Sequence, residues 1–396
     1  RPPLDRIAAR GYPRAVAWPG VWTGGFGVKI ERVTPILVDR CLLVRVHTDE
    51  GIVGTGEAGL WSQHRLVYEA INDLADYFVG QDAGRIEHHY QAVTRDTHFA
   101  GAPLSAALSA IDIALWDILG KATGLPVHQL LGGKVRDKVR VFANVNGETP
   151  EARGESARQA VERGYTSLRT TPFFTGWEEQ VPSKYIGAAV DIVRAIRDAV
   201  GFDIDLGLEI HRNLGPDEAV VLATELAPFR ILYYEDPVAP ESLEALRYVA
   251  RHVNLPIATG ERYHTIYQFK ELLDTGTVAT IRADLSLAGG YTQMRKIAAM
   301  AEAGFVGIFP HLMGSPVNLA AFAQFGAATP NYVLMERGVE ALNEIVEEPL
   351  VFEGGYVLVP DRPGIGVELR EDRLGKFPYR SHKIAPARRA DGAVAH

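Results

Sequence analysis

The 396-residue chain contains a single cysteine, Cys41. One cysteine excludes an intramolecular disulfide, so a cytoplasmic location is expected, although a disulfide-free exported protein would look the same. No apolar run approaches the ~18–20 residues of a membrane span, so no membrane partner is expected. The chain also lacks any block of five like charges, and its formal net charge is −8. A nucleic-acid partner is not expected either, because phosphate binding requires a basic face.

The first third of the chain has the pattern of an α+β domain. Residues 1–27 are rich in Arg, Pro and Gly, which predicts an extension or flexible loop. Strand-like runs such as "VKIERVTPILV" then give way to helical periodicity over 64–96 and 103–122. We therefore expect an α+β domain over residues 28–138, with its strands first and its helices after them.

From residue 139 short apolar runs alternate with helix-like segments. Eight such runs are present, from "VRVFANV" (139–145) to "YVLME" (332–336). Strands that alternate with helices pair in parallel, and eight units predict an α/β fold with a TIM-like barrel over residues 139–345. Residues 346–383 are β-like and are expected to return to the first domain, and 384–396 are expected to be disordered.

Several of these predicted strands end in a charged or polar side chain. The spacing from one such residue to the next is 23 to 27 residues, which is one strand–helix unit. In a barrel, residues at matching ends of successive strands meet at the C-terminal mouth, where active sites of this fold lie. The residues concerned are Glu209, Glu235, Glu261, Asp284, His311 and Glu336.

Glu209, Glu235 and Glu261 predict a metal site. Three carboxylates on neighbouring strands repel one another unless a cation neutralises them. Oxygen ligands without Cys or His favour Mg²⁺, or else Mn²⁺, over Zn²⁺. A single Glu in this position could instead cap a helix or pair with an arginine, but three in register favour the metal.

Asp284 and His311 predict a catalytic base. A carboxylate on one strand can orient a histidine on the next and raise its basicity. His311 could otherwise be a structural histidine of the turn "FPHLMGSP". His211 lies two residues past Glu209 and should face the same side of the strand, as a proton donor or alternatively as a metal ligand.

Glu336 and Arg169 are the remaining candidates at the strand ends. Glu336 ends the last predicted strand and could hydrogen-bond a substrate oxygen or pair with an arginine. Arg169 ends the second predicted strand and could contact an anionic group or a developing charge, or form a surface ion pair.

The ordered motifs resemble the mandelate racemase-like branch of the enolase superfamily, and most of all its acid-sugar dehydratases. The matching stretches are "VGTGEA", "GLPVHQLLGG", "GLEIHRNL", "YYEDP", "ATGERYH", "LAGGYTQMRKIAAMAE", "FPHLMGSP" and "PGIGVEL". The resemblance implies an α+β capping domain built from both chain ends over a (β/α)₇β barrel. It also implies Mg²⁺ on Glu209, Glu235 and Glu261, and an enediolate formed beside a carboxylate.

Two positions depart from the pattern of this family. Many relatives carry a Lys-x-Lys pair on the second strand, where this chain has Arg169 and Thr171, so a two-base racemase is not expected. Galactonate dehydratases also lack a working lysine and use the His–Asp pair. Their first metal ligand is usually Asp, where this chain has Glu209. The tyrosine base of mannonate dehydratases has no assignable counterpart.

The expected reaction is dehydration of a hexonate or pentonate to a 2-keto-3-deoxy acid. His311 would remove the C2 proton, His211 would protonate the leaving 3-hydroxyl, and Glu336 would stabilise the enediolate. The stretches "WPGVWTGGFG" (18–27) and "GEAGLWSQHR" (56–65) would close the mouth. Alternatives are a racemase, epimerase or lactonising enzyme, a metal-binding member without turnover, or a barrel of unrelated chemistry. The resemblance further implies an even-numbered homo-oligomer, commonly an octamer.

Overall fold

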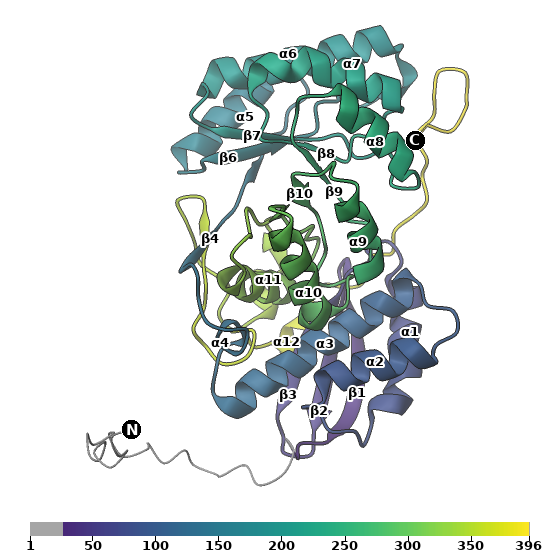
Figure 1. Ribbon diagram of the computed structural model, residues 1–396. Helices are drawn as coiled ribbons and strands as arrows, with labels where there is room; N and C mark the ends of the chain where they lie inside the picture. The colour runs from purple at the N-terminus through teal and green to yellow at the C-terminus, as the bar shows by residue number, and fades with distance from the viewer. Residues whose placement is uncertain (1–26, 396) are drawn as a thin grey trace, which may run out of the picture.

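The computed structural model describes residues 27–395 (Figure 1). The extension predicted for residues 1–27, and with it the mouth-closing stretch 18–27, lies outside the described residues except for Gly27. Figure 1 shows an antiparallel sheet with three helices below the barrel.

The capping domain is an antiparallel sheet covered by helices. Its strands are β1 (Ile30–Val38), β2 (Cys41–Thr48) and β3 (Val53–Ala58), and its helices are α1 (His64–Phe78), α2 (Ile86–Asp96) and α3 (Ala102–Thr123). Gly54 and Gly56 of β3 let α3 approach closely, because a Cβ at either position would overlap the α3 backbone at Ala114 or Ala110. This contact gives a packing reason for the glycines of "VGTGEA".

Helix α3 qualifies the expectation about membrane spans. By length and composition it is apolar enough to cross a membrane. It is instead mostly buried in the fold, where Asp112 and Asp117 accept hydrogen bonds from Thr292 and Thr55. These two acids interrupt the helix sequence, so it contains no continuous apolar run of membrane-spanning length.

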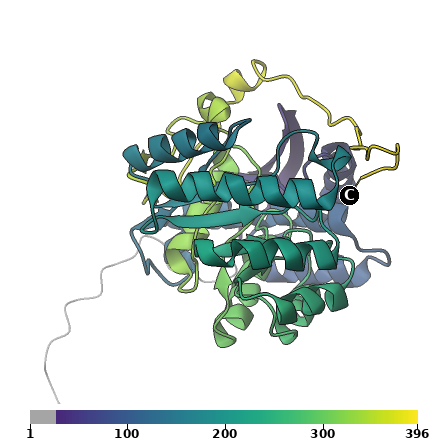
Figure 2. The same ribbon diagram turned by 90° about the horizontal axis from the view of Figure 1, so that it is seen from above.

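The second part is a parallel barrel of alternating strands and helices. Its seven strands pair in chain order, and Figure 2 shows their helices from above. The strands are β5 (Ala143–Asn144), β6 (Ser167–Thr170), β7 (Asp205–Glu209), β8 (Tyr233–Glu235), β9 (Ile257–Thr259), β10 (Thr280–Ile281) and β11 (Gly307–Ile308). The helices are α5 (Pro150–Glu162), α6 (Pro182–Val200), α7 (Pro216–Leu226), α8 (Leu243–His252), α9 (Ile266–Asp274), α10 (Gly290–Ala303) and α11 (Pro316–Ala328). Side-chain caps at Thr149, Ser242 and Thr265 explain where α5, α8 and α9 begin.

The predicted eighth strand is reduced to isolated bridges that close the ring. Tyr332 bridges to Ile308 of β11, and Met335 bridges to Val141, just before β5. Backbone hydrogen bonds from Val333 N to Ile308 O (2.7 Å) and from Met335 N to Arg140 O (2.9 Å) hold this segment between the two edge strands. The α/β barrel with a capping domain is therefore confirmed.

The remaining strands and short helices connect the C-terminal part of the chain with segments that precede the barrel. β4 (Lys138–Arg140) pairs with β13 (Tyr356–Leu358), which pairs with β12 (Phe352–Glu353). Beyond β13, Ile365 N donates to Asp117 of α3 at 2.9 Å. The short helices are α4 (Val127–Leu130), α12 (Glu371–Leu374), η1 (Trp177–Glu179), η2 (Ala227–Phe229) and η3 (Glu340–Ile345).

Glu57 of β3 connects the capping domain with the barrel. Its buried carboxylate accepts hydrogen bonds from Ser315 N (2.9 Å), Ser315 Oγ (2.6 Å) and Asn318 N (3.1 Å) at the start of α11. Burial raises the pKa of Glu57 to about 7. Because these contacts fix the loop that follows His311, the capping domain helps to position a catalytic candidate.

The inside of the barrel is filled by a small aromatic cluster below the mouth. Its buried members are Phe142, Tyr233, Ala258, Phe309 and Leu334. Gly207 lies against this cluster, because a Cβ at that position would overlap the ring of Tyr233. Leu206 and Leu208, on the other face of β7, join the main core, and Gly207 makes room for the tyrosine.

Substitution of Gly207 by alanine is expected to destabilise the protein. The new methyl group would force the buried Tyr233 ring to move, and overpacking of this kind costs about 1–3 kcal/mol. The matched control is Gly187→Ala on an exposed face of α6 with open space around it, which is expected to stabilise by roughly 0.5–1 kcal/mol. Denaturant unfolding measures both; equal free energies for Gly207→Ala and the wild type would contradict this packing.

Candidate active site

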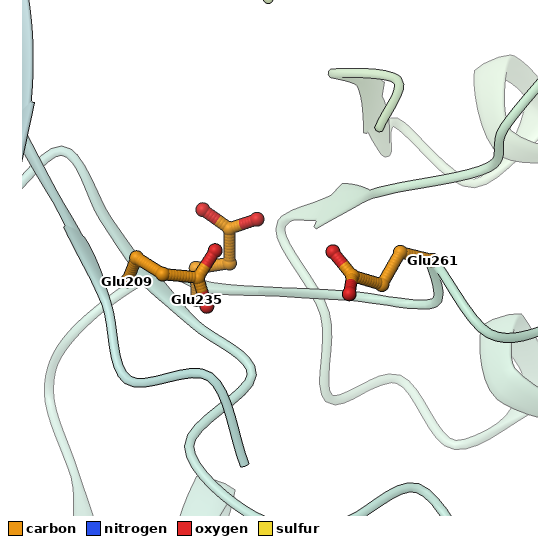
Figure 3. A group of neighbouring side chains, drawn as sticks. All are labelled: Glu209, Glu235 and Glu261. Carbon is orange, nitrogen blue, oxygen red and sulfur yellow. The ribbon is translucent and has the colours of Figure 1, made fainter. Parts of the chain in front are cut away.

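Three buried glutamates converge at the C-terminal mouth of the barrel. Glu209 ends β7, Glu235 ends β8, and Glu261 lies two residues beyond β9. Figure 3 shows their side chains turned toward one shared space, and one oxygen of each lies within 4.8 Å of the others. The three glutamates, which lie one strand–helix unit apart in the sequence, are therefore close together in the barrel.

The lack of hydrogen bonds to three oxygens of these carboxylates fits a site for a divalent cation. Among residues 27–395, no hydrogen bond reaches Glu209 Oε1 or either oxygen of Glu235, although all three atoms are buried. Burial raises the pKa of Glu209 well above its usual range, and the negative charge of Glu235 raises it further. Buried carboxylate oxygens that accept no hydrogen bond are available as ligands for a hard cation such as Mg²⁺.

Three arginines offset part of the acidic charge. Arg169 Nη1 lies 3.4 Å from Glu209 and 3.6 Å from Glu235, and the fully buried Arg282 forms ion pairs with Glu235 and Glu336. Arg212 lies 2.6 Å from Glu261. These three arginines face six acidic side chains, so the acids of the cluster outnumber its arginines. The carboxylates are Glu209, Glu235, Asp236, Glu261, Asp284 and Glu336.

Arg282, Arg212 and Asp236 were not identified from the sequence. A signal for Arg282 was available, because it stands in the apolar run "ATIRAD" two residues before Asp284 and so on the same side of an extended segment. The sequence indication for Arg212 and Asp236 was weaker. Arg212 directly follows the candidate His211, and Asp236 directly follows the candidate Glu235. Arg212 pairs with both Asp236 and Glu261, which ties the ends of three strands together.

His311 and Asp284 form the expected pair. His311 Nδ1 lies 2.8 Å from Asp284 Oδ2, while Asp284 Oδ1 accepts from Ser286 N at 2.8 Å and Ser286 Oγ at 2.6 Å. Burial alone would lower the pKa of His311, but the charge of Glu261 and the bond to Asp284 raise it to about 9. The ring is therefore oriented and basic, with Nε2 left for another contact.

His211 lies at the site because of a turn, and not because of strand alternation as expected. The strand ends at Glu209, and His211 and Arg212 adopt left-handed backbone angles, with φ of 59° and 66°. Strand alternation consequently does not apply to His211, yet the turn directs it into the same cleft as His311. Burial lowers the pKa of His211, and the adjacent Arg212 lowers it further.

Glu336 and Arg169 pair with each other. Arg169 Nη1 lies 3.1 Å from Glu336 Oε1, and Arg282 contacts the same oxygen. Burial alone would raise the pKa of Glu336, but the charges of Arg282 and Arg169 lower it. Glu336 is therefore an ionised acceptor of hydrogen bonds, and of the two alternatives drawn from the sequence, pairing with an arginine is the one observed.

These side chains line one cleft of about 280 Å³. Trp61, from the predicted mouth-closing stretch 56–65, and Met313 form part of its wall. The catalytic and metal candidates in its lining are Arg169, Glu209, His211, Glu261, His311 and Glu336. Two glutamates of the triad, a histidine with a carboxylate partner and a second histidine thus share one space.

The chain is similar over nearly its full length to proteins named D-galactonate dehydratase. It is 37% identical to D-galactonate dehydratase of Pectobacterium atrosepticum, covering 93% of this chain and 100% of that one. It is 38% identical to D-galactonate dehydratase of Ralstonia pickettii with the same coverage. A crystal structure of an enolase from Pantoea ananatis with bound D-gluconate and Mg superimposes with a TM-score of 0.88, at 30% identity over 93% of this chain and 100% of that chain.

Two families match the two parts of the fold. The N-terminal domain of mandelate racemase and muconate lactonizing enzyme matches residues 32–132, and the family described as enolase C-terminal domain-like matches residues 152–373. The full-length similarity to dehydratases agrees with a cleft that combines a base, an acidic cation site and a second histidine. The chain therefore belongs to the enolase superfamily, in its mandelate racemase and muconate lactonizing enzyme branch, as a hydro-lyase.

Proposed function

We propose that this chain dehydrates a sugar acid, a hexonate or pentonate in size, to a 2-keto-3-deoxy acid in a Mg²⁺-dependent reaction. The observation that carries the proposal is that Glu209, Glu261, His311 and His211 line one cleft. Glu235 completes the glutamate triad, and Asp284 pairs with His311. Relatives named D-galactonate dehydratase and a neighbour with bound D-gluconate and Mg support this substrate class.

Glu209, Glu235 and Glu261 would hold the ion, and Mn²⁺ could take the place of Mg²⁺ because its ligand preference is similar. When bound, the ion would supply positive charge to the substrate carboxylate, which makes the adjacent C2–H bond more acidic. Arg282 and Arg212 keep Glu235 and Glu261 oriented toward the shared space.

In its deprotonated form His311 accepts the C2 proton at Nε2, and Asp284 on Nδ1 holds the ring in the tautomer that leaves Nε2 free. A cation among the glutamates would offset the charge of Glu261, which raises the pKa of His311, and would so favour the deprotonated ring. Electrons from the C2–H bond move into the enediolate, to which Arg169 offers a positive charge. The C3–O bond then breaks as His211 donates a proton to the departing hydroxyl, so that water leaves and the enol becomes the 2-keto acid. Glu336 holds Arg169 and accepts a hydrogen bond from a substrate hydroxyl.

Racemisation on the same scaffold is the second candidate. It requires a second base on the opposite face of C2, a position at which Arg169 and Thr171 stand in this chain. Within residues 27–395 no lysine lines the cleft. Elimination is therefore favoured, and NMR of the product distinguishes a keto-deoxy acid from an epimer or a lactone.

The direct test is a panel of hexonates and pentonates incubated with the full chain and Mg²⁺, with the 2-keto-3-deoxy product assayed chemically. Turnover of at least one member is expected. Failure on every member, with C2 deuterium exchange in heavy water also absent, would reject the proposed function in favour of a metal-binding protein without turnover.

Replacement of His211 by asparagine is expected to separate the two halves of the reaction. Loss of the proton donor should lower dehydration by about 10²–10⁴-fold, while His311 continues to exchange the C2 proton. NMR in heavy water measures both rates on the same sample. His252→Asn, at an exposed position at the end of α8, is the matched control. An equal loss of exchange and dehydration would contradict this division of roles.

A further inference from the structure

The carboxylate of Asp284 is held by a different neighbour on each of its oxygens. Oδ2 lies 2.8 Å from His311 Nδ1, while Oδ1 accepts hydrogen bonds from Ser286 N at 2.8 Å and from Ser286 Oγ at 2.6 Å. The carboxylate cannot turn without breaking a bond to Ser286. Its orientation toward the imidazole of His311 therefore depends on this serine.

Asn318 of α11 makes the next contact in this series. Its Nδ2 donates to Ser286 Oγ at 3.1 Å, and its backbone N donates to Glu57 Oε2 at 3.1 Å. A serine hydroxyl has one proton, so an Oγ that accepts from an amide and contacts a carboxylate gives its proton to the carboxylate. Asn318 therefore directs the hydroxyl proton of Ser286 toward Asp284.

Fold stability does not account for an asparagine at position 318. The side chain is fully buried, and within residues 27–395 its Oδ1 accepts no hydrogen bond. A buried polar atom without a partner costs free energy, whereas a leucine of similar size would fill the same space without that cost. The contact with Ser286 is the only side-chain hydrogen bond of Asn318 that the described residues show, so the function of the amide lies there.

The capping domain packs directly on this pair of residues. Gly59, which follows β3, donates from its N to Ser286 O at 2.8 Å, and a Cβ on Gly59 would lie 3.0 Å from Ser286 Oγ. Likewise, a Cβ on Gly314 would lie 2.7 Å from Asn318 Nδ2. Contacts this close leave both side chains little room to turn away from Asp284.

We propose that Asn318 and Ser286 are positioning residues for the catalytic base and that they act in series. Asn318 orients the hydroxyl of Ser286, and this hydroxyl fixes the carboxylate that orients His311. The inference rests on the proposed function, in which His311 takes the C2 proton. Neither Asn318 nor Ser286 lines the cleft, so both act on the reaction through Asp284 and make no contact with the substrate.

The experiment measures dehydration of galactonate and C2 exchange in heavy water by the full chain with Mg²⁺. Ser286→Ala should lower kcat and the exchange rate by about 10-fold, because Asp284 loses the hydroxyl and keeps only the bond from the backbone N. Asn318→Leu should lower both by about 3-fold with an unchanged free energy of unfolding. KM should change little in either variant, since the substrate touches neither residue. Unchanged kcat in Ser286→Ala, or a loss that appears in KM alone, would overturn the inference.

The double variant tests whether the two residues act in series. Without the hydroxyl of Ser286 the amide of Asn318 has nothing to orient, so the double variant should match Ser286→Ala in kcat, whereas independent effects would multiply. Ser109→Ala is the matched control. The buried Ser109 Oγ accepts from Gly289 N at 2.8 Å where α3 packs on the same loop, and the hydrogen bonds of Ser109 within residues 27–395 do not involve Asp284. An equal loss of kcat in this control, or multiplied losses in the double variant, would contradict the proposed series.

The Nδ1 proton of His311 gives a readout that does not need turnover. Its bond to Asp284 protects it from exchange with solvent, and its NMR signal is the one that disappears in His311→Asn. In Ser286→Ala this proton should exchange about 10-fold faster, whereas in Ser109→Ala it should exchange as in the wild type. An unchanged exchange rate in Ser286→Ala would overturn the inference. Faster exchange in a chain that dehydrates no sugar acid would support the positioning role and reject the proposed function alone.

Discussion

Substitution of His311 by asparagine is expected to abolish both C2 proton exchange and dehydration. In the proposed reaction the imidazole of His311 is the base. Its Nδ1 lies 2.8 Å from Asp284, and Asp284 in turn accepts a hydrogen bond from Ser286 N. Asparagine keeps a polar group of similar size but cannot accept the substrate proton. Loss of a general base of this kind lowers kcat by about 10²–10⁴-fold.

Exchange and turnover are measured in heavy water with the substrate identified by the panel, and circular dichroism checks the fold. His98→Asn, at an exposed position between α2 and α3, is the control and should retain wild-type rates. Exchange at the wild-type rate in His311→Asn would reassign the base. Loss in the control as well would point to a general effect of histidine replacement.

Removal of the divalent cation by a chelator is expected to have an effect of similar size on turnover. Without the ion Glu209 Oε1 and both oxygens of Glu235 accept no hydrogen bond from residues 27–395, and the substrate carboxylate would enter a cluster in which acids outnumber arginines. Lewis-acid stabilisation is worth several kcal/mol, so turnover should fall by about 10³-fold or more and return with Mg²⁺.

Thermal unfolding gives a readout of the metal site that does not depend on activity. An ion that binds only the folded chain stabilises it by about 2.7 kcal/mol at 100 times its dissociation constant. Glu235→Gln should remove this shift, whereas Glu244→Gln, at an exposed position on α8, should retain it. Full turnover in chelator, or an equal shift in Glu235→Gln and the wild type, would contradict the assigned ligands.

The convergence of the six strand-end residues could be predicted because their spacing follows the repeat of the fold. Residues that lie one strand–helix unit apart are neighbours at the mouth, and this does not depend on the side chains between them. Accordingly, Glu209, Glu235 and Glu261 lie close together there. The pairing of His311 with Asp284 followed from the same rule, since β10 and β11 are adjacent. The sequence left two roles open for Glu336. A glutamate that hydrogen-bonds a substrate and one that pairs with an arginine cannot be distinguished by their sequence pattern.

The sequence by itself determined the alternation of strands and helices, and with it the identity of the residues at the mouth. Only the tertiary structure decided how they are oriented and neutralised. Arg282 reaches Glu235 and Glu336 across the barrel, and His211 enters the cleft through a left-handed turn after the strand has ended. Likewise, Arg40 and Lys383 line one cavity although they stand far apart in the chain. Local periodicity specifies the elements, whereas contacts between residues hundreds of positions apart depend on how those elements pack.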